Sequence, residues 1–103
     1  MALSVADKAH ALARYDRWTS LPAMALEALE KGGDRPFLWS KPDGADAYQS
    51  LSFAEVRRRI VAFAHALRTL GLAPGERVLL AAENRPDWLI ADVAIMAAGG
   101  VTV

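Results

Sequence analysis

Two histidines are the side chains of this sequence best suited to acid–base chemistry or metal binding near neutral pH. His10 and His65 lie far apart in the chain, and no cysteine accompanies them, because the sequence contains none. Short metal motifs place their ligands a few residues apart, so this pair predicts no metal site. On a helix, His65 falls opposite the apolar side chains and faces solvent. We therefore expect both histidines to be ordinary structural or surface residues.

Charged side chains offer two further candidates. The run Arg57, Arg58 and Arg59 resembles a basic patch, but consecutive helical residues fan through about 200° and share no single surface, which favours a solvated face. Glu55 and Arg59 are spaced for a helical ion pair of only about 0.3–0.5 kcal/mol. Asp92 lies on an otherwise apolar helical arc, and a buried carboxylate needs a partner. We favour a structural hydrogen bond or ion pair for Asp92 over catalysis.

The last candidate functional residues are aromatic and amide side chains. Trp18, Trp39 and Trp88 could form a ligand platform, but they fall on three separate predicted elements, so core or interface packing is favoured. Asn84 is better explained as a helix cap than as a ligand contact. The turn of residues 83–86 has no glycine, and neither nucleotide-binding glycine motif occurs in the chain. We therefore assign no catalytic, cofactor-binding or metal-binding residue.

The elements that would position these residues are clearest after Leu51. Ser52 and Glu55 form a capping box, which predicts a helix from Phe53 to about Leu70 that ends at Gly71. Its apolar stripe has a helical period and consists of Phe53, Val56, Ile60, Phe63, Leu67 and Leu70.

A strand and a second helix follow this first helix. The apolar run Val78–Ala82 predicts a central parallel strand covered on both faces. Pro86 and Asp87 suit the first turn of the second helix, which Asn84 caps and Gly99 ends. That helix has almost no polar face, which predicts burial on more than one side. A further strand begins at Val101.

The first half of the chain predicts a helix and a hairpin. Ser20 caps a helix over Leu21–Lys31, which ends at the pair of glycines that follows it. A β-hairpin pairs residues 37–39 with residues 48–50 around the turn Lys41–Gly44. Residues 1–19 form a lead-in arm that we expect to be partly disordered, and residues 20–103 form one partial domain.

Three segments in this order carry a family resemblance: Leu51–Glu55, Gly71–Val78 and Glu83–Trp88. Together they resemble the N-terminal segment of the adenylate-forming (AMP-binding) synthetases. The segments 82–92 and 97–101 are most similar to the long-chain fatty acyl-CoA ligases, and residues 18–22 are compatible with the lead-in of those enzymes. The likeness covers residues 18–103.

The resemblance implies an α/β fold that is the N-terminal part of an acyl-CoA synthetase large domain. A β-hairpin would be followed by helix–strand–helix–strand, with an incomplete parallel sheet and a chain that stops within a strand. The parent enzyme would activate a fatty acid with ATP and Mg²⁺ to an acyl-adenylate and then transfer the acyl group to coenzyme A. The family's phosphate loop and catalytic lysine lie downstream, so we expect residues 1–103 alone to be inactive and to bind none of these cofactors.

The composition limits which partners and which cellular compartment the sequence allows. Twelve acidic side chains balance twelve basic ones, which argues against a nucleic-acid surface. No run reaches the roughly 20 apolar residues of a transmembrane helix, and the N-terminus lacks the apolar segment of a signal peptide. The absence of cysteine fits a reducing compartment. We predict a cytoplasmic protein and leave association with the membrane surface open.

Two functions from different classes stay open on the sequence alone. The chain is either the N-terminal scaffold of a long-chain fatty acid–CoA ligase, which we favour, or a stand-alone non-catalytic interaction module derived from that scaffold. In both cases the open sheet edge and uncovered apolar faces predict association into homo-oligomers, swapping or aggregation of the isolated chain. A gene that continues past Val103 to a phosphate loop would favour the ligase.

Overall fold

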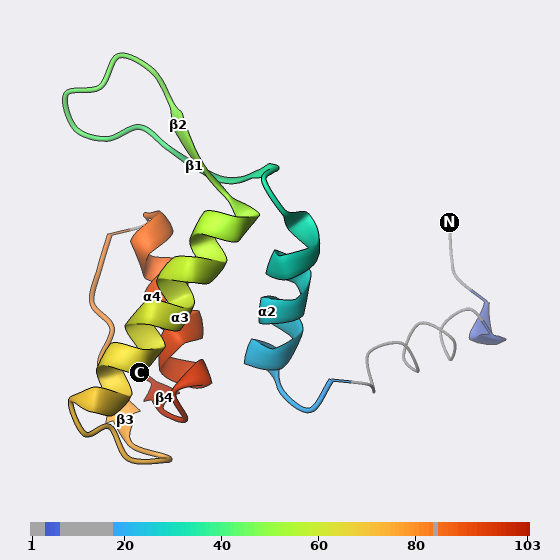
Figure 1. Ribbon diagram of the computed structural model, residues 1–103, viewed down its shortest axis with the longest axis vertical. Coiled ribbons are helices and arrows are strands. Elements are labelled where there is room, and N and C mark those ends of the chain that lie inside the picture. Colours follow the sequence, from blue (N-terminus) through green and yellow to red (C-terminus); the bar gives the residue numbers. More distant parts are fainter. Residues whose placement is uncertain (1–3, 7–17, 84) are drawn as a thin grey trace.

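A hairpin and a parallel strand pair flank three helices in the computed structural model, which describes residues 4–6, 18–83 and 85–103 (Figure 1). The elements in chain order are α2 (Leu21–Gly32), β1 (Pro36–Ser40), β2 (Gln49–Ser52), α3 (Phe53–Thr69), β3 (Arg77–Val78), α4 (Pro86–Ala97) and β4 (Val101–Thr102). This order confirms the predicted hairpin followed by helix–strand–helix–strand. Most of the predicted lead-in arm and Asn84 lie outside the described residues.

Helices α2 and α3 begin where serine side chains satisfy free backbone donors. Ser20 Oγ accepts a hydrogen bond from the backbone N–H of Ala23 at 3.2 Å, and Ser52 Oγ accepts one from the N–H of Glu55 at 3.0 Å. A Ser N-cap supplies the acceptor that the first helical turn lacks within the helix. The predicted starts of α2 and α3 are therefore confirmed.

Helices α3 and α4 end in the same way. Gly71 and Gly99 follow them with φ angles of 99° and 92°, a region that glycine enters without steric cost. Each helix end carries a pair of hydrogen bonds: Gly71 N–H to Arg68 O and Leu72 N–H to Leu67 O after α3, and Gly99 N–H to Met96 O and Gly100 N–H to Ile95 O after α4. This is the Schellman motif. It confirms both predicted glycine stops.

The β1–β2 hairpin is antiparallel, with Trp39 opposite Ser50. Its register is interrupted by a bulge between Pro36 and Leu38, which leaves Phe37 outside the ladder. The connecting loop turns at Gly44, whose φ of 80° confirms the predicted turn chemistry.

Phe53 is the point at which α2, the hairpin and α3 meet. Its ring stacks on Phe37 with centroids 4.4 Å apart, and the Arg35 guanidinium lies 5.5 Å from its centroid. Gly32 touches the same ring so closely that an added Cβ would lie 2.1 Å from Phe53 Cγ. The N–H groups of Phe53 and Ala54 donate to carbonyls of the turn after α2, at 3.0 and 2.9 Å. We call this contact the Phe53 junction.

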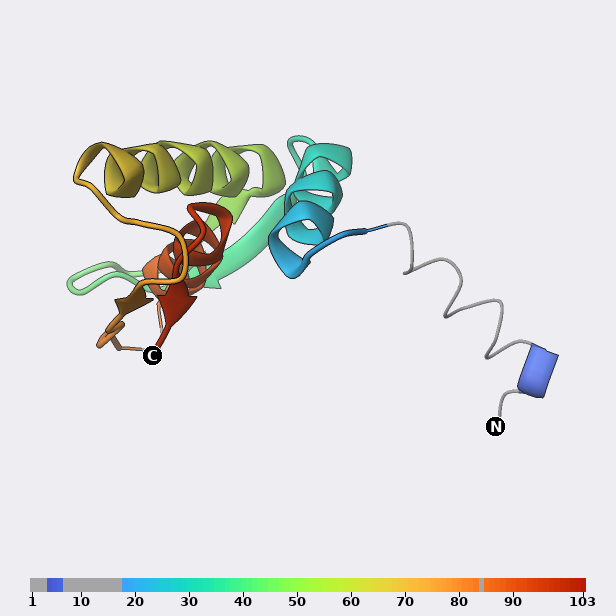
Figure 2. The same cartoon turned by 90° about the horizontal axis from the view of Figure 1, so that it is seen from below.

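The main core lies between the three helices. Its buried members are Leu29 of α2, Val56 and Ile60 of α3, and Ile90, Val93 and Ala94 of α4. Helix α4 packs against α2, α3, β1 and β4, which confirms that its nearly continuous apolar surface is buried on more than one side. Figure 2 shows α3 crossing over α4, with α2 beside them.

The apolar stripe of α3 is covered over only part of its length. Val56 and Ile60 are 0% and 1% exposed, whereas Phe63 and Leu70 are 42% and 85% exposed. The predicted packing face is therefore correct in its first half and open to solvent in its second half.

Strands β3 and β4 pair in parallel, with Arg77 opposite Val101, which confirms the predicted direction. The turn before β3 is tied to the end of α4, because the Gly75 N–H donates to Gly99 O at 2.8 Å. The predicted strand Val78–Ala82 is too long, since β3 ends at Val78, although the Leu80 N–H still donates to Val103 O. Its predicted burial on both faces is also wrong: Leu79 is 77% exposed. Within the described chain, helices cover one face of this pair.

Candidate functional site

An open hollow of about 1060 Å³ lies between the hairpin and the start of α4. Trp39 and Tyr48 line it from the hairpin, and Trp88 lines it from the first turn of α4. These three rings are 60%, 69% and 40% exposed, so solvent reaches all of them. Charged side chains of both signs complete the wall: Arg59 from α3, Lys41 and Asp43 from the hairpin loop, and Glu83, Arg85 and Asp87 from the α4 approach.

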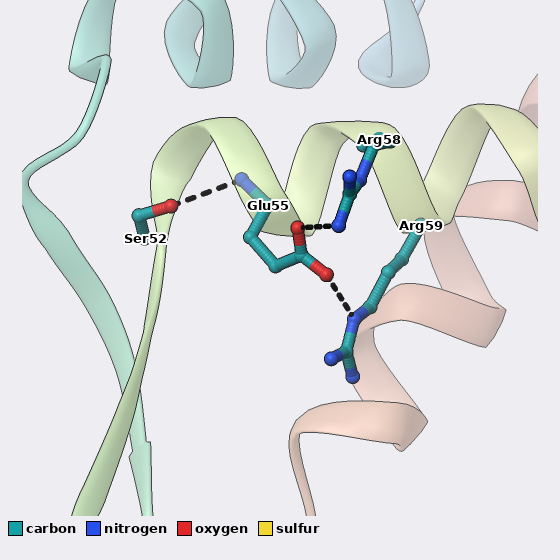
Figure 3. Close-up of polar contacts among 4 residues, drawn as sticks. All are labelled: Ser52, Glu55, Arg58 and Arg59. Atoms are coloured by element: carbon teal, nitrogen blue, oxygen red, sulfur yellow. Dashed lines mark hydrogen bonds and ion pairs between the residues drawn. The ribbon is translucent and has the colours of Figure 1, made fainter.

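Arg59 of α3 lines this hollow and is bound by Glu55 from the first turn of the same helix (Figure 3). The Arg59 Nε–H donates to Glu55 Oε1 at 2.8 Å, and Arg58 pairs with the other oxygen of the same carboxylate. The predicted Glu55–Arg59 pair is therefore confirmed. The predicted capping box is only half formed: Ser52 caps the helix, but the Glu55 side chain binds two guanidinium groups instead of reaching back to the helix start. Two charged donors at i+3 and i+4 outcompete one neutral backbone N–H.

This arrangement changes the acidity of the carboxyl group. The hydrogen bond from Arg59 is the main cause that lowers the pKa of Glu55, and the charges of Arg58 and Arg59 act in the same direction. Desolvation of the carboxylate opposes them. Glu55 is therefore held in its ionised form and fixes the position of Arg59 on the wall of the hollow.

A second ion pair lies at the entrance to α4. Arg85 donates to Glu83 Oε2 from both Nε and Nη2, at 3.0 and 2.6 Å. This hydrogen bonding raises the pKa of Arg85, and the negative charge of Asp43 across the hollow adds to the effect. Arg85 occupies the N-cap position without a capping side-chain bond, which differs from the predicted cap at Asn84, a residue outside the described part of the chain.

The predicted aromatic residues separate into two groups. Trp39 and Trp88 lie on separate elements, as predicted, but the fold brings both to the same hollow, where they are exposed instead of buried in the core. Sequence spacing could not reveal this, because it depends on how the hairpin lies against α4. Trp18 is elsewhere, and its Nε1–H donates to Glu27 on α2.

The remaining candidates do not join the hollow. His65 is exposed on α3, as predicted, and His10 lies outside the described residues. Asp92 is only half-buried, and its carboxylate makes no hydrogen bond or ion pair within the described chain, so its expected partner is not found. Arg57 is half-buried, and among the described residues its Nε has no partner. The three arginines share no common surface, as predicted: Arg58 and Arg59 bind Glu55, and Arg57 lies apart.

The chemistry available here is binding or packing. In the part of the chain that the structure describes, no three His, Cys, Asp or Glu side chains gather to hold a metal ion. The hollow contains neither histidine nor cysteine among its lining residues. Aromatic faces and mixed charges can hold a neighbouring surface.

The family model described as AMP-binding enzyme matches residues 26–103. This chain belongs to the AMP-binding enzyme family. A long-chain-fatty-acid–acyl-carrier-protein ligase of Arabidopsis thaliana chloroplasts is 34% identical to the AMP-binding chain over 94 residues, which are 87% of this chain and 12% of that ligase.

Solved structures agree with the family assignment. The acetoacetyl-CoA synthetase of Streptomyces lividans matches 80% of the AMP-binding chain and 12% of its own, with a TM-score of 0.71 and 34% identity. ATP-bound MatB of Rhodopseudomonas palustris matches 77% of this chain and 15% of its own, with a TM-score of 0.56 and 28% identity. The fold therefore resembles the N-terminal part of the large domain of adenylate-forming enzymes, as predicted.

The AMP-binding chain spans only 12% of the length of the Arabidopsis ligase. Over the described residues, no helix has both the length and the apolar character needed to cross a bilayer.

Proposed function

We propose that this chain is the N-terminal scaffold of an ATP-dependent ligase that activates a fatty acid as an acyl-adenylate and then transfers the acyl group to a thiol. The observation that carries the proposal is the family match over residues 26–103, with relatives that are fatty-acid ligases.

A long-chain fatty acid is the proposed substrate, and coenzyme A is the proposed acceptor. The resemblance of residues 82–92 to long-chain fatty acyl-CoA ligases supports both. The Arabidopsis relative is named for an acyl-carrier protein instead, so the acceptor has to be tested directly. ATP and Mg²⁺ would be bound by the parent enzyme, and the cytoplasm is its proposed compartment.

The scaffold would act through its rigid helix starts. Ser52 and the carbonyls after α2 fix α3, and Glu55 then fixes Arg59 beside the hollow. A surface held in this way can position a neighbouring part of the enzyme without moving during turnover.

Pyrophosphate release tests the proposal. The protein encoded by the complete source gene and the 103-residue chain are each incubated with ATP, Mg²⁺ and palmitate, with coenzyme A or acyl-carrier protein as the acceptor. We expect pyrophosphate release by the complete protein and none by the 103-residue chain. Octanoate and acetate provide matched controls for chain length. Turnover by the 103-residue chain alone would overturn the scaffold assignment.

A stand-alone interaction module is the second candidate. It is supported by the large exposed apolar side chains, which include Leu70 at 85% and Leu79 at 77% exposure. A source gene that encodes nothing after Val103 would favour it, whereas an open reading frame with a phosphate loop would favour the ligase.

A further inference from the structure

Asp43 and Gly44 form the centre of a turn in the hairpin loop. The Ala45 N–H donates to Pro42 O at 3.0 Å, which closes a β-turn around them. Gly44 has a φ of 80°, a value that the third residue of a type II turn adopts. Both central residues are exposed to solvent. In the whole sequence, a glycine directly follows an aspartate only here.

The groups on the two sides of the Asp43–Gly44 peptide bond are free to react with each other. Among the described residues, the Asp43 carboxylate has no hydrogen-bond or ion-pair partner, and the Gly44 N–H donates to no acceptor. A Cβ added at Gly44 would meet nothing within 4 Å, so the space beside this residue is open. An aspartate side chain reaches the nitrogen of the next residue through a five-membered ring, and glycine hinders this approach least because it has no side chain.

We infer that Asp43 is a site of spontaneous isomerisation to isoaspartate. The Gly44 nitrogen attacks Asp43 Cγ and forms a new N–Cγ bond. One carboxyl oxygen leaves as water and takes the carboxyl proton and the amide proton with it, which gives a cyclic imide. Water then opens the ring: cleavage of the N–Cγ bond restores aspartate, whereas cleavage of the original peptide bond leaves a chain that runs through Cγ and carries a free α-carboxylate. The second step consumes the water that the first released, so no oxidant, reductant or cofactor is needed.

Other aspartates in the described chain lack this combination. Two of them lie within α4, where the helix fixes the backbone. Asp34 precedes Arg35, whose N–H is already bonded to a carbonyl of α2. Asp46 lies in the same exposed loop as Asp43, but it precedes Ala47, which carries a methyl group beside the attacking nitrogen. Asp46 is therefore an internal control.

Isomerisation at this position would change the wall of the hollow, because Asp43 is one of its lining residues. The main chain would gain one methylene group, and the carboxylate would move from the side chain to Cα. Hydrogen bonding to Glu83 is the main cause that raises the pKa of Arg85, and the charge of Asp43 adds to it. The reaction would therefore move a negative charge that acts on Arg85 across the hollow.

Oxygen-isotope labelling of the complete protein encoded by the source gene tests the assignment. The protein is kept for several weeks in neutral buffer made with heavy-oxygen water and is then digested in ordinary water. Each ring opening in the labelled buffer leaves one heavy oxygen at the residue, and peptide fragmentation distinguishes isoaspartate from aspartate. Ring closure during digestion adds no label. We expect labelled isoaspartate at Asp43 and about tenfold less at Asp46, which corresponds to a barrier about 1.4 kcal/mol higher.

Two variants make the test specific. Asp43→Glu keeps the carboxylate but requires a six-membered ring, and Gly44→Ala places a methyl group beside the attacking nitrogen. Both should lose the labelled isoaspartate. Equal label at Asp43 and Asp46, label that persists in Asp43→Glu, or label that appears only after unfolding in urea would overturn the inference. Pyrophosphate release does not enter this test, so the inference and the proposed function fail separately.

Discussion

The two ends of α3 differ in how fully the surrounding chain covers their side chains. At the N-terminal end, the Phe53 junction holds a stacked ring pair, and the first three N–H groups of the helix all have acceptors. At the C-terminal end, Leu70 is 85% exposed, and the chain continues through β3 to Leu79, which is 77% exposed. The first end is closed by α2, the turn after it and β1, whereas the side chains at the second end stay exposed in the described chain. Substitutions at the two ends should therefore have very different effects on stability.

The largest loss is expected from Gly32→Ala at the Phe53 junction. Alanine gains about 0.5–1 kcal/mol of helix propensity over glycine, but overpacking costs about 1–3 kcal/mol. The new Cβ would lie 2.1 Å from Phe53 Cγ and 2.5 Å from Phe53 Cβ, so the clash should prevail. We expect a net loss of about 1–2 kcal/mol in the free energy of unfolding, measured by urea titration of tryptophan fluorescence. Glu30→Ala, at an exposed position of the same helix, is the control. A Gly32→Ala variant more stable than the parent would show that the junction is loosely packed.

A smaller loss is expected from Ser52→Ala. The substitution removes the acceptor for the Glu55 N–H, and loss of a serine cap costs about 1 kcal/mol. The exposed Ser50 on β2 provides the matched control, since Ser50→Ala removes the same hydroxyl without removing a cap. Urea titration of the two variants compares them directly. Equal stability of the two would show that the carbonyls after α2 hold the start of α3 without the serine.

A still smaller loss of stability is expected when the pH is lowered. Because the pKa of Glu55 is lowered in the folded chain, its ion pairs stabilise the fold above the ordinary glutamate pKa of about 4.3. This stabilisation should fall as the pH drops below that value and vanish below the lowered pKa. Glu55→Gln should therefore be less stable than the parent at pH 7 and equal to it at low pH, in urea titrations over this range. A constant difference at all pH values would contradict the assignment.

The smallest effect in the 103-residue chain is expected from Leu79→Ser, directly after β3. An exposed side chain contributes within about 0.5 kcal/mol, so the free energy of unfolding should hardly change. Light scattering should show less association than in the parent, because the substitution removes apolar surface. A large loss in the 103-residue chain would erase the contrast between the two ends of α3.

Helix boundaries were predictable because their signals are local. Ser20, Ser52, Gly71 and Gly99 mark caps through their own side chains or φ angles, and each occurs where the sequence indicates. The hairpin was predictable for the same reason, since turn residues separate its two strands.

The sequence does not predict those features that depend on packing between distant parts of the chain. The length and cover of the strand after α3 depend on neighbours far along the chain, and the sequence of Val78–Ala82 contains no information about them. Trp39 and Trp88 share a hollow because of the way the hairpin lies against α4. The spacing of residues along the sequence does not show this arrangement.

The hydrogen bond from Gly75 to Gly99 has a consequence for the evolution of this segment. It joins the turn after α3 to the cap of α4, and so it sets the spacing at which β3 meets β4. An insertion or deletion of one residue between Gly71 and Glu76 would slide one strand past the other and turn Leu79 inward. The exposed hairpin loop carries no such restriction. Natural length variation among relatives should therefore gather in residues 41–47 and be rare in residues 71–76.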